Sequence, residues 1–248
     1  MSSPADKPER IEAFNFAPAR RLGHKYEIIA LLGRGYEGEV YKVRELATGI
    51  ERAAKFFYPH RNARDRAFNY YANKLNKLRR CPILISYLTH DEVTYRGRRI
   101  RFIVSEYVEG ELLSAFLRHQ PGGRLTPFEG MHLLHTLAAG LETIHEMREY
   151  HGDLHTDNII IKRRGIRFQV KLIDMYRWRV STGENIREDV VDIIRIFYDT
   201  LGGAKYYSKQ PPEVKNICRG LKRTLIKKQF RTAGQLRRYL ETMEWESR

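Results

Sequence analysis

The spacing of apolar residues in the N-terminal part of the chain predicts a sheet that is interrupted by one helix. Short apolar runs with strand character alternate with turn residues such as Thr48-Gly49 and Gly97. Within residues 64–78 the apolar positions recur at helical spacing instead. The expected strands cover residues 26–32, 40–43, 52–57, 83–88 and 100–107. Because short turns join most of these runs, we expect an antiparallel, hairpin-rich sheet in a small α+β unit.

After Gly110 the pattern becomes mainly helical. Thr126, Pro127 and Glu129 form a typical helix start, with Thr as the N-cap, Pro in the first turn and Glu three residues after the cap. Apolar residues then follow at helical spacing as far as Ile144. This segment is therefore predicted to be a long helix with one buried face.

The remaining pattern predicts a small hairpin followed by further helices. Residues 159–162 and 170–173 are short apolar runs that we expect to pair as strands. Residues 189–200 have a helical apolar face, and residues 214–243 are expected to form two more short helices.

The N-terminus and the cysteines limit where the chain can act. The first 22 residues carry three prolines and several charges, so we expect a mostly mobile tail that Phe14 and Phe16 could pin to the body. The start has no signal-peptide pattern, and no apolar run is long enough to span a membrane. Cys81 and Cys218 are the only cysteines, which argues against a disulfide framework and favours the cytoplasm.

Length and charge indicate a globular chain with acidic partners. The 248 residues, 42% of them hydrophobic, suffice for one sizeable globular unit. The formal net charge of +15 favours nucleotides, nucleic acid, an anionic membrane face or acidic proteins as partners.

The candidate chemistry is concentrated in residues 151–161. Asp153 and Asn158 lie in a loop before one expected strand, and Asp174 ends the next one. A carboxylate beside an acceptor hydroxyl, followed by an amide and a second carboxylate for magnesium, has the parts needed for phosphoryl transfer. His151 and His155 are four residues apart and His145 is near, but a zinc site would need a fourth ligand and would not explain the asparagine.

Three glycines and a lysine indicate a phosphate site. Gly33, Gly35 and Gly38 lie between two expected strands, where a backbone without side chains can approach phosphates and offer its N–H groups. The alternative is an ordinary hairpin loop. Lys55 lies in an apolar strand and is expected to reach the phosphates; without the glycine loop before it, a lysine that points to solvent would be the better interpretation.

The segment 101–110 runs from a strand towards the helical part of the chain. An extended linker of this kind can offer backbone N–H and C=O groups to an adenine edge. Glu106 and Val108 are the residues expected to do so.

In order, these motifs resemble the protein-kinase-like superfamily over residues 26–200. The resemblance implies an α+β, two-lobed fold that binds MgATP, with a sheet-rich N-lobe at 23–108 and a shortened helical C-lobe at 109–248. It makes ATP and Mg²⁺ the expected cofactors, with a hydroxyl acceptor. The implied nucleotide-binding residues are Gly33, Gly35, Gly38, Val40, Lys55, Glu106 and Val108.

The resemblance also implies individual roles in the helical lobe. Asp153 would accept the proton of the acceptor hydroxyl, and Asn158 and Asp174 would hold magnesium. His151 would be structural, and Asp189 would brace the catalytic loop.

The catalytic loop departs from the pattern of protein kinases. Gly152 stands where many of them have Arg, and His155 replaces the usual Lys. His-Gly-Asp-Leu-His is similar to aminoglycoside and other small-molecule kinases; a charged His155 would stabilise the transferred phosphoryl group. Met175-Tyr176 replaces Phe-Gly, and the segment before Asp189 is short. The acceptor, a protein Ser/Thr or a small molecule, therefore stays open.

The carboxylate partner of Lys55 is missing from its expected place. In the family this acid lies on the helix at residues 64–78, and its position here falls on Ala72. The only acid in that helix is Asp65, about two turns earlier. Either Lys55 uses another partner, or the helix register differs, or the protein is catalytically weak.

Two further hypotheses follow from these features. The weak-enzyme alternative is a pseudokinase that docks a partner. Residues 215–238 contain nine Lys or Arg and no Asp or Glu, which indicates either the solvated face of amphipathic helices or a docking surface for an acidic partner, with nucleic acid not excluded.

Overall fold

The computed structural model describes residues 10–165, 167–175 and 181–244. The chain divides into two compact units. Unit 1 comprises residues 1–77 and 86–107, and unit 2 comprises residues 78–85 and 108–248.

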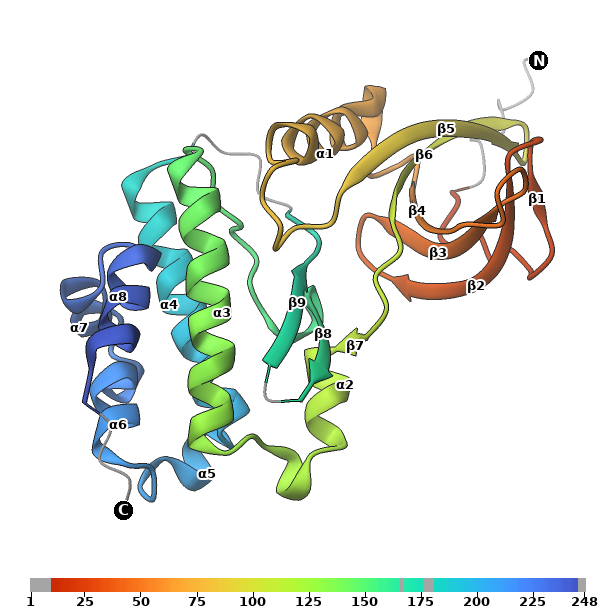
Figure 1. Ribbon diagram of the computed structural model, residues 1–248. Helices are drawn as coiled ribbons and strands as arrows, with labels where there is room; N and C mark the ends of the chain where they lie inside the picture. Colours follow the sequence, from red (N-terminus) through yellow and green to blue (C-terminus); the bar gives the residue numbers. More distant parts are fainter. Residues whose placement is uncertain (1–9, 166, 176–180, 245–248) are drawn as a thin grey trace, which may run out of the picture. The chain divides into compact units, whose positions relative to one another are not determined.

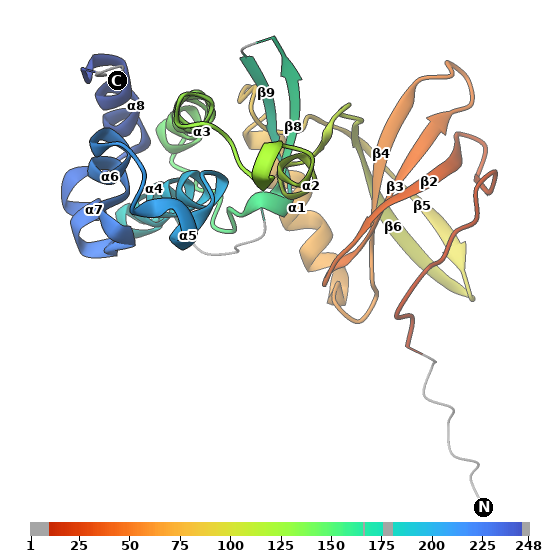
Figure 2. The same cartoon turned by 90° about the horizontal axis from the view of Figure 1, so that it is seen from below.

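Unit 1 is built on a six-stranded antiparallel sheet with the strand order β1-β2-β3-β4-β6-β5. Figure 2 labels β2 to β6 of this sheet. The helix α1 packs against β5 and β6, and a 3₁₀ turn, η1, precedes it. The elements are β1 Arg21–Leu22, β2 Tyr26–Arg34, β3 Gly38–Glu45, β4 Glu51–Phe57, η1 Ala63–Asp65, α1 Arg66–Lys77, β5 Tyr87–Tyr95 and β6 Arg98–Glu106.

Unit 2 is mainly helical, with a small three-stranded sheet of order β7-β8-β9. Its long central helix, α3, packs against α4 and α8 (Figure 1). The α-helices are α2 Leu113–Arg118, α3 Pro127–Glu146, α4 Gly183–Thr200, α5 Gly203–Tyr207, α6 Pro212–Cys218, α7 Arg223–Gln229 and α8 Ala233–Thr242. The strands and 3₁₀ turns are β7 Glu111–Leu112, η2 Pro121–Gly123, η3 Thr156–Asn158, β8 Ile159–Arg164, β9 Arg167–Leu172 and η4 Arg219–Leu221.

The helix start at Thr126 is confirmed. The Thr126 hydroxyl accepts a hydrogen bond from the N–H of Glu129 at 3.3 Å, and the Glu129 carboxylate accepts one from the N–H of Thr126 at 2.9 Å. These reciprocal bonds satisfy donors that the first turn leaves without helical partners. The predicted apolar face is fully buried as far as Ile144.

The strand predicted for residues 83–88 is wrong for most of its length. Leu84 instead forms an isolated parallel bridge with Leu172 in unit 2, and β5 begins only at Tyr87. Ile83 packs on α3, where a Cβ at Gly140 would lie 2.1 Å from the Ile83 side chain. Residues 78–85 therefore belong to unit 2, whereas the sequence analysis assigned them to the N-lobe.

The C-terminal helices differ in number from the prediction. Residues 214–243 were expected to hold two short helices, but they hold most of α6 and all of α7 and α8. Arg219 and Leu221 have φ of 49° and 57°, and these left-handed residues separate α6 from α7. Such backbone breaks leave apolar periodicity unchanged, so the pattern did not reveal them.

Residues 10–22, which are predicted to belong to a tail, contribute side chains to the core of unit 1. Phe14 is 1% exposed, and its ring lies 5.3 Å from that of Phe16 and 5.4 Å from that of Tyr58. The expected anchoring by Phe14 and Phe16 is thus present, and Ile11 is buried with them.

Candidate active site

The glycine segment forms the hairpin between β2 and β3. The N–H of Gly35 donates to the carbonyl of Gly38 at 2.9 Å. A Cβ at Gly38 would lie 1.7 Å from the backbone oxygen of Phe56, so the sheet itself requires glycine there. A Cβ at Gly33 or Gly35 would meet no atom within 4 Å. The space at these two glycines is therefore open to a ligand.

Lys55 lies on β4, opposite Val40 of β3. Its ammonium is 3.0 Å from the Glu37 carboxylate in the glycine hairpin. It also lies 4.4 Å from the ring centre of Tyr71 on α1, close enough for a cation–π contact. The sequence analysis left the partner of Lys55 open, and the structure identifies Glu37 as a partner.

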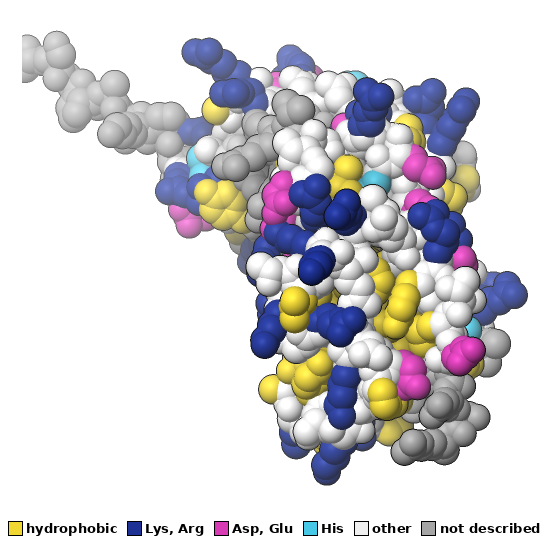
Figure 3. All heavy atoms as spheres, turned by 90° about the vertical axis from the view of Figure 1, so that its left-hand side faces the viewer, with side chains coloured by type: hydrophobic (Ala, Val, Ile, Leu, Met, Phe, Trp, Pro, Cys, Tyr) yellow, Lys and Arg dark blue, Asp and Glu magenta, His cyan; other side chains and the backbone are white. Residues whose placement is uncertain are grey.

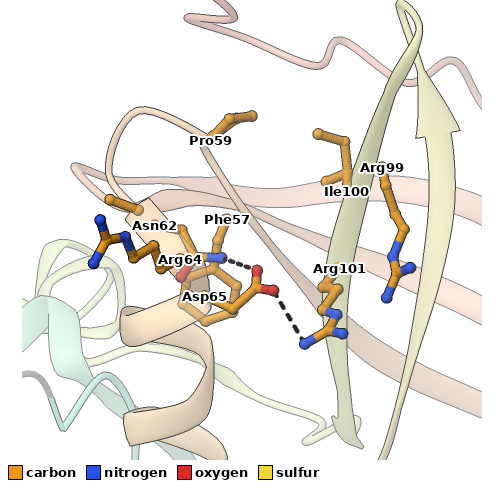
Figure 4. Close-up of a pocket in the computed structure, with 9 residues that line it drawn as sticks. Phe57, Pro59, Asn62, Arg64, Asp65, Arg99, Ile100 and Arg101 are labelled. Atoms are coloured by element: carbon orange, nitrogen blue, oxygen red, sulfur yellow. Dashed lines mark hydrogen bonds and ion pairs between the residues drawn. The ribbon is translucent and has the colours of Figure 1, made fainter.

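Asp65, the only acid expected near the helix, is directed elsewhere. Its carboxylate lies 3.1 Å from the Arg101 guanidinium and accepts a hydrogen bond from the Asn62 side chain at 3.1 Å (Figure 4). Residues 66–77, which form α1, contain no Asp or Glu. The helix therefore offers no carboxylate of its own to Lys55.

The two expected adenine contacts fall in different units. Glu106 ends β6 in unit 1, and Val108 is in unit 2. The N–H of Glu106 donates to the carbonyl of Ser86 at 3.0 Å, and its carboxylate accepts from the Ser86 N–H at 2.8 Å. The N–H of Glu106 is thus already used within unit 1.

In unit 2 a buried carboxylate holds the start of the catalytic loop. Asp189 of α4 is fully buried and accepts hydrogen bonds from the N–H groups of His151 and Gly152, at 2.7 and 2.8 Å. His145 of α3 contributes a third contact through Nε2, at 3.1 Å. Gly152 has a φ of +82°, in the region that favours glycine. The replacement of Arg by Gly at this position therefore suits the local backbone.

Asp153 and Asn158 meet across the loop. The Asn158 amide nitrogen donates to the backbone oxygen of Asp153 at 2.8 Å and to its carboxylate at 3.2 Å. His155 Nε2 lies 3.8 Å from the same carboxylate, and its Nδ1 accepts from the N–H of Asp157 at 3.2 Å. Because Nδ1 accepts, the proton of a neutral His155 is on Nε2 and faces Asp153. The Asp153 side chain is 46% exposed and can meet a substrate.

Asp174 is brought to this loop by the hairpin β8–β9. Ile159 pairs with Leu172, so the residues just beyond the pair, Asn158 and Ile173, also face each other. The N–H of Ile173 donates to the Asn158 carbonyl at 3.0 Å, and the Ile173 carbonyl accepts from His151 Nε2 at 2.9 Å. Asp174 follows directly, with a left-handed φ of 56°.

The donor chemistry of Asn158 and Asp174 fits a magnesium ion. Since the Asn158 amide nitrogen is used by Asp153, the amide oxygen is the atom that can bind a cation. Amide and carboxylate oxygens are hard ligands of the kind that Mg²⁺ prefers. Over the residues that the structure covers, no group of three or more His, Cys, Asp or Glu is arranged to hold a metal ion.

A family model described as "Protein kinase domain" matches residues 26–192, which is more than half of the chain. The chain belongs to the protein kinase family. The match includes the glycine hairpin, Lys55, the catalytic loop and Asp189.

Curated kinases of similar sequence are about 30% identical to this chain over the aligned residues. A probable serine/threonine-protein kinase of Streptomyces coelicolor is 30% identical over 161 residues, covering 62% of this chain and 23% of that protein. The serine/threonine-protein kinase pkn2 of Myxococcus xanthus is 29% identical over 161 residues, covering 62% of this chain and 18% of that protein. The kinase chain thus spans less than a quarter of either relative.

A solved kinase structure has the same fold. The PknI kinase domain of Mycobacterium tuberculosis, in a double-mutant form, aligns with a TM-score of 0.65 at 18% identity. The alignment covers 91% of this chain and 97% of that one. This similarity confirms the predicted α+β kinase fold.

Sequence reasoning missed the role of Glu37 and the contact made by His145. An acid between Gly35 and Gly38, on the hairpin next to the strand of Lys55, is the signal that could have identified Glu37. His145 was considered only as a zinc ligand, whereas it binds Asp189 and has a buried Nδ1 without a hydrogen-bond partner.

Proposed function

We propose that this kinase transfers the γ-phosphate of ATP to a hydroxyl group. The observation that carries the proposal is the hydrogen-bonded loop in which Asp189 holds the backbone, Asn158 contacts Asp153, and Ile173 ties Asp174 to Asn158. Positioning and electrostatics contribute most of the rate in phosphoryl transfer, and such a fixed loop supplies positioning.

Each candidate residue has a distinct role in this proposal. Asp153 orients the acceptor hydroxyl and accepts its proton, and His155, whose Nε2 faces Asp153, stabilises the transferred group. Asn158 and Asp174 would hold Mg²⁺, which supplies positive charge to the phosphates. In unit 1, Lys55 binds the α- and β-phosphates. The hairpin at Gly33, Gly35, Gly38 and Val40 covers the nucleotide, and Glu106 and Val108 contact adenine.

We infer that the acceptor is a serine or threonine of a protein. This inference is supported by the curated relatives, which are named as serine/threonine-protein kinases. The small-molecule alternative rests on Gly152 and His155, the two catalytic-loop residues that resemble aminoglycoside kinases.

A second candidate function is a binding module without transferase activity. It is favoured by one observation: Lys55 is paired with a glycine-hairpin carboxylate, and α1 contains no acid. In this case the protein would act by docking a partner.

The basic C-terminal helices are the proposed docking surface for an acidic partner. Figure 3 shows Lys and Arg side chains spread over the face that carries α6, α7 and α8. Part of this charge is neutralised, since Lys227 contacts Glu184 and Glu188 while Arg237 lies 2.6 Å from Glu142. Within residues 181–244, no ion pair is formed by Lys222, Lys228, Arg231 or Arg238. These four side chains would contact the partner.

The cytoplasm is the proposed location. Cys81 and Cys218 are both buried and unpaired, which suits a reducing compartment. Over the residues that the structure covers, no helix has the length and apolar character needed to cross a membrane.

Replacing Asp153 with Asn tests the proposed transfer. The parent protein should move label from γ-labelled ATP to a Ser/Thr-containing protein pool, and Asp153→Asn should abolish transfer while MgATP still raises the melting temperature. Transfer by Asp153→Asn at the parent rate would contradict the role of Asp153. Label that goes only to a metabolite pool would favour the small-molecule acceptor. Stabilisation without transfer by the parent would favour the binding module.

A further inference from the structure

The Lys55 ammonium is partly enclosed by an acid and an aromatic ring. Its side chain is 11% exposed and that of Glu37 is 13% exposed, and their charged atoms are 3.0 Å apart. The ring of Tyr71 covers another side of the ammonium at 4.4 Å. Screening by water is weak at such low exposure, so the attraction between Lys55 and Glu37 is stronger than in an ordinary surface pair.

The position of Glu37 is fixed by its backbone. Its carbonyl accepts a hydrogen bond from the N–H of Tyr58 at 2.8 Å, just after β4 ends. Val40 and Lys55 are direct neighbours in the β3–β4 register, so the hairpin lies beside the strand of the lysine. The contact between Glu37 and Lys55 is thus built into the hairpin and does not depend on α1.

The Glu37 carboxylate and a bound phosphate would both place negative charge beside the Lys55 ammonium. The hairpin is expected to hold phosphates with its backbone N–H groups, and Lys55 is expected to hold them with its ammonium. Glu37 is part of the hairpin and contacts Lys55. A phosphate that approaches Lys55 must compete with Glu37 for the ammonium and is also repelled by it.

We propose that Glu37 sets the nucleotide affinity of this kinase by occupying Lys55 in competition with the phosphates of ATP. This inference rests on the proposed function, because it requires that Lys55 binds phosphate. The part of the site that limits nucleotide affinity is then the glycine hairpin. Binding of MgATP then has to break the Glu37–Lys55 pair, whereas binding of adenosine, which has no phosphate, does not.

Calorimetric titration of Glu37→Gln tests the competition. The variant keeps the shape of the side chain and removes its charge, so its Kd for MgATP should fall about fivefold or more. Its Kd for adenosine should equal that of the parent. The matched control is Glu51→Gln, which breaks an ion pair of similar length, 2.7 Å to Lys42, in the same sheet. That control should leave both affinities unchanged.

The other outcomes separate this inference from the proposed function. Equal MgATP affinity in the parent and Glu37→Gln would overturn the competition but leave nucleotide binding intact. Weaker binding by the variant would overturn it too, since Glu37 would then position Lys55 for the phosphates. Tighter binding of adenosine as well as MgATP would mean a general loosening of the hairpin and would also overturn it. Binding of MgATP by neither protein would overturn the inference and the proposed function together.

A second variant covers the case in which Glu37→Gln does not fold. Glu37→Asp keeps the charge but shortens the side chain by one methylene, which draws the carboxylate back from Lys55. Its MgATP affinity should lie between those of the parent and a charge-free site, with adenosine affinity again unchanged. An MgATP affinity at or below the parent value would count against the competition.

Discussion

The backbone N–H of Ile173 donates a hydrogen bond to the carbonyl of Asn158 at 3.0 Å. This contact extends the β8–β9 hairpin by one step beyond its last strand pair, Ile159 with Leu172. It sets Asn158 beside the residue that precedes Asp174. The relative position of the two proposed metal ligands is therefore a property of the hairpin register.

Removing the Asp189 carboxylate should destabilise unit 2. Asp189→Ala removes the carboxylate that accepts from the buried N–H of His151 and the partly buried N–H of Gly152, at a cost of about 1–3 kcal/mol each. We expect the free energy of unfolding to fall by about 3 kcal/mol, measured by urea denaturation. Arg195→Ala, an exposed site on the same helix, should change it by less than about 0.5 kcal/mol. Equal stabilities of the two variants would contradict the bracing role of Asp189.

Substitutions at two glycines of the hairpin should distinguish an effect on stability from an effect on ligand binding. Gly38→Ala places a Cβ 1.7 Å from the Phe56 oxygen, so the strands must move apart and the melting temperature should fall by several degrees. Gly35→Ala has open space and should melt near the parent temperature. If the hairpin covers the phosphates, Gly35→Ala should nevertheless weaken MgATP binding. A large drop in the melting temperature for Gly35→Ala would show that the space is not open.

Alkaline pH should weaken unit 1 through a buried tyrosine. Burial first, and then the Glu39 carboxylate, raise the pKa of Tyr58 to about 12. An unfolded tyrosine titrates near pH 10, so the folded protein holds the proton more tightly. Its stabilising contribution is complete below about pH 10 and is lost as the pH rises through about 12.

The variant Tyr58→Phe isolates this contribution, because it keeps the ring that stacks on Phe14 but cannot ionise. Between pH 9.5 and 12, as measured by urea denaturation, the parent should lose more stability than Tyr58→Phe. Parallel curves for the two proteins would rule out Tyr58 as a source of the alkaline loss.

Phe14 should contribute as much stability as a residue of the central sheet. It is 1% exposed and packs against the rings of Phe16, Phe56 and Tyr58, so Phe14→Ala should cost about 3–5 kcal/mol. Leu88→Ala is the control in the same unit, because Leu88 is 44% exposed. Its effect on the urea unfolding midpoint should be small. A Phe14→Ala variant as stable as the control would mean that the N-terminal segment does not hold to the sheet.

The helices and strands that flank the candidate catalytic loop could be predicted because local patterns determine them. The N-cap at Thr126 and the strand pattern after Asn158 depend on neighbours in the sequence, and so both appear in the structure where they were expected. Residues 83–88 combine strand propensity with an apolar pattern that suits either unit. Only the tertiary pairing of Leu84 with Leu172 decides between them.

The partner of Lys55 could not be predicted either, because it is set by a tertiary contact. The family pattern directs the search to α1, where Ala72 stands at the expected position. Glu37 contacts Lys55 from the hairpin between β2 and β3, and the spacing of apolar residues does not predict such a contact. The roles of Asp153, Asn158, Asp174 and Lys55 in catalysis stay predictions.

The packing of Ile11, Phe14 and Phe16 determines at which residue a fragment that contains unit 1 should begin. A fragment that starts at residue 23, where the apolar pattern of the sheet suggests a boundary, would lose four buried side chains from its interior, those of Ile11, Phe14, Phe16 and Leu22. The rings of Tyr41, Phe56 and Tyr95 would then face water and favour aggregation. Residues 10–22, which look dispensable in the sequence, therefore help to shield the hydrophobic core of unit 1 from water.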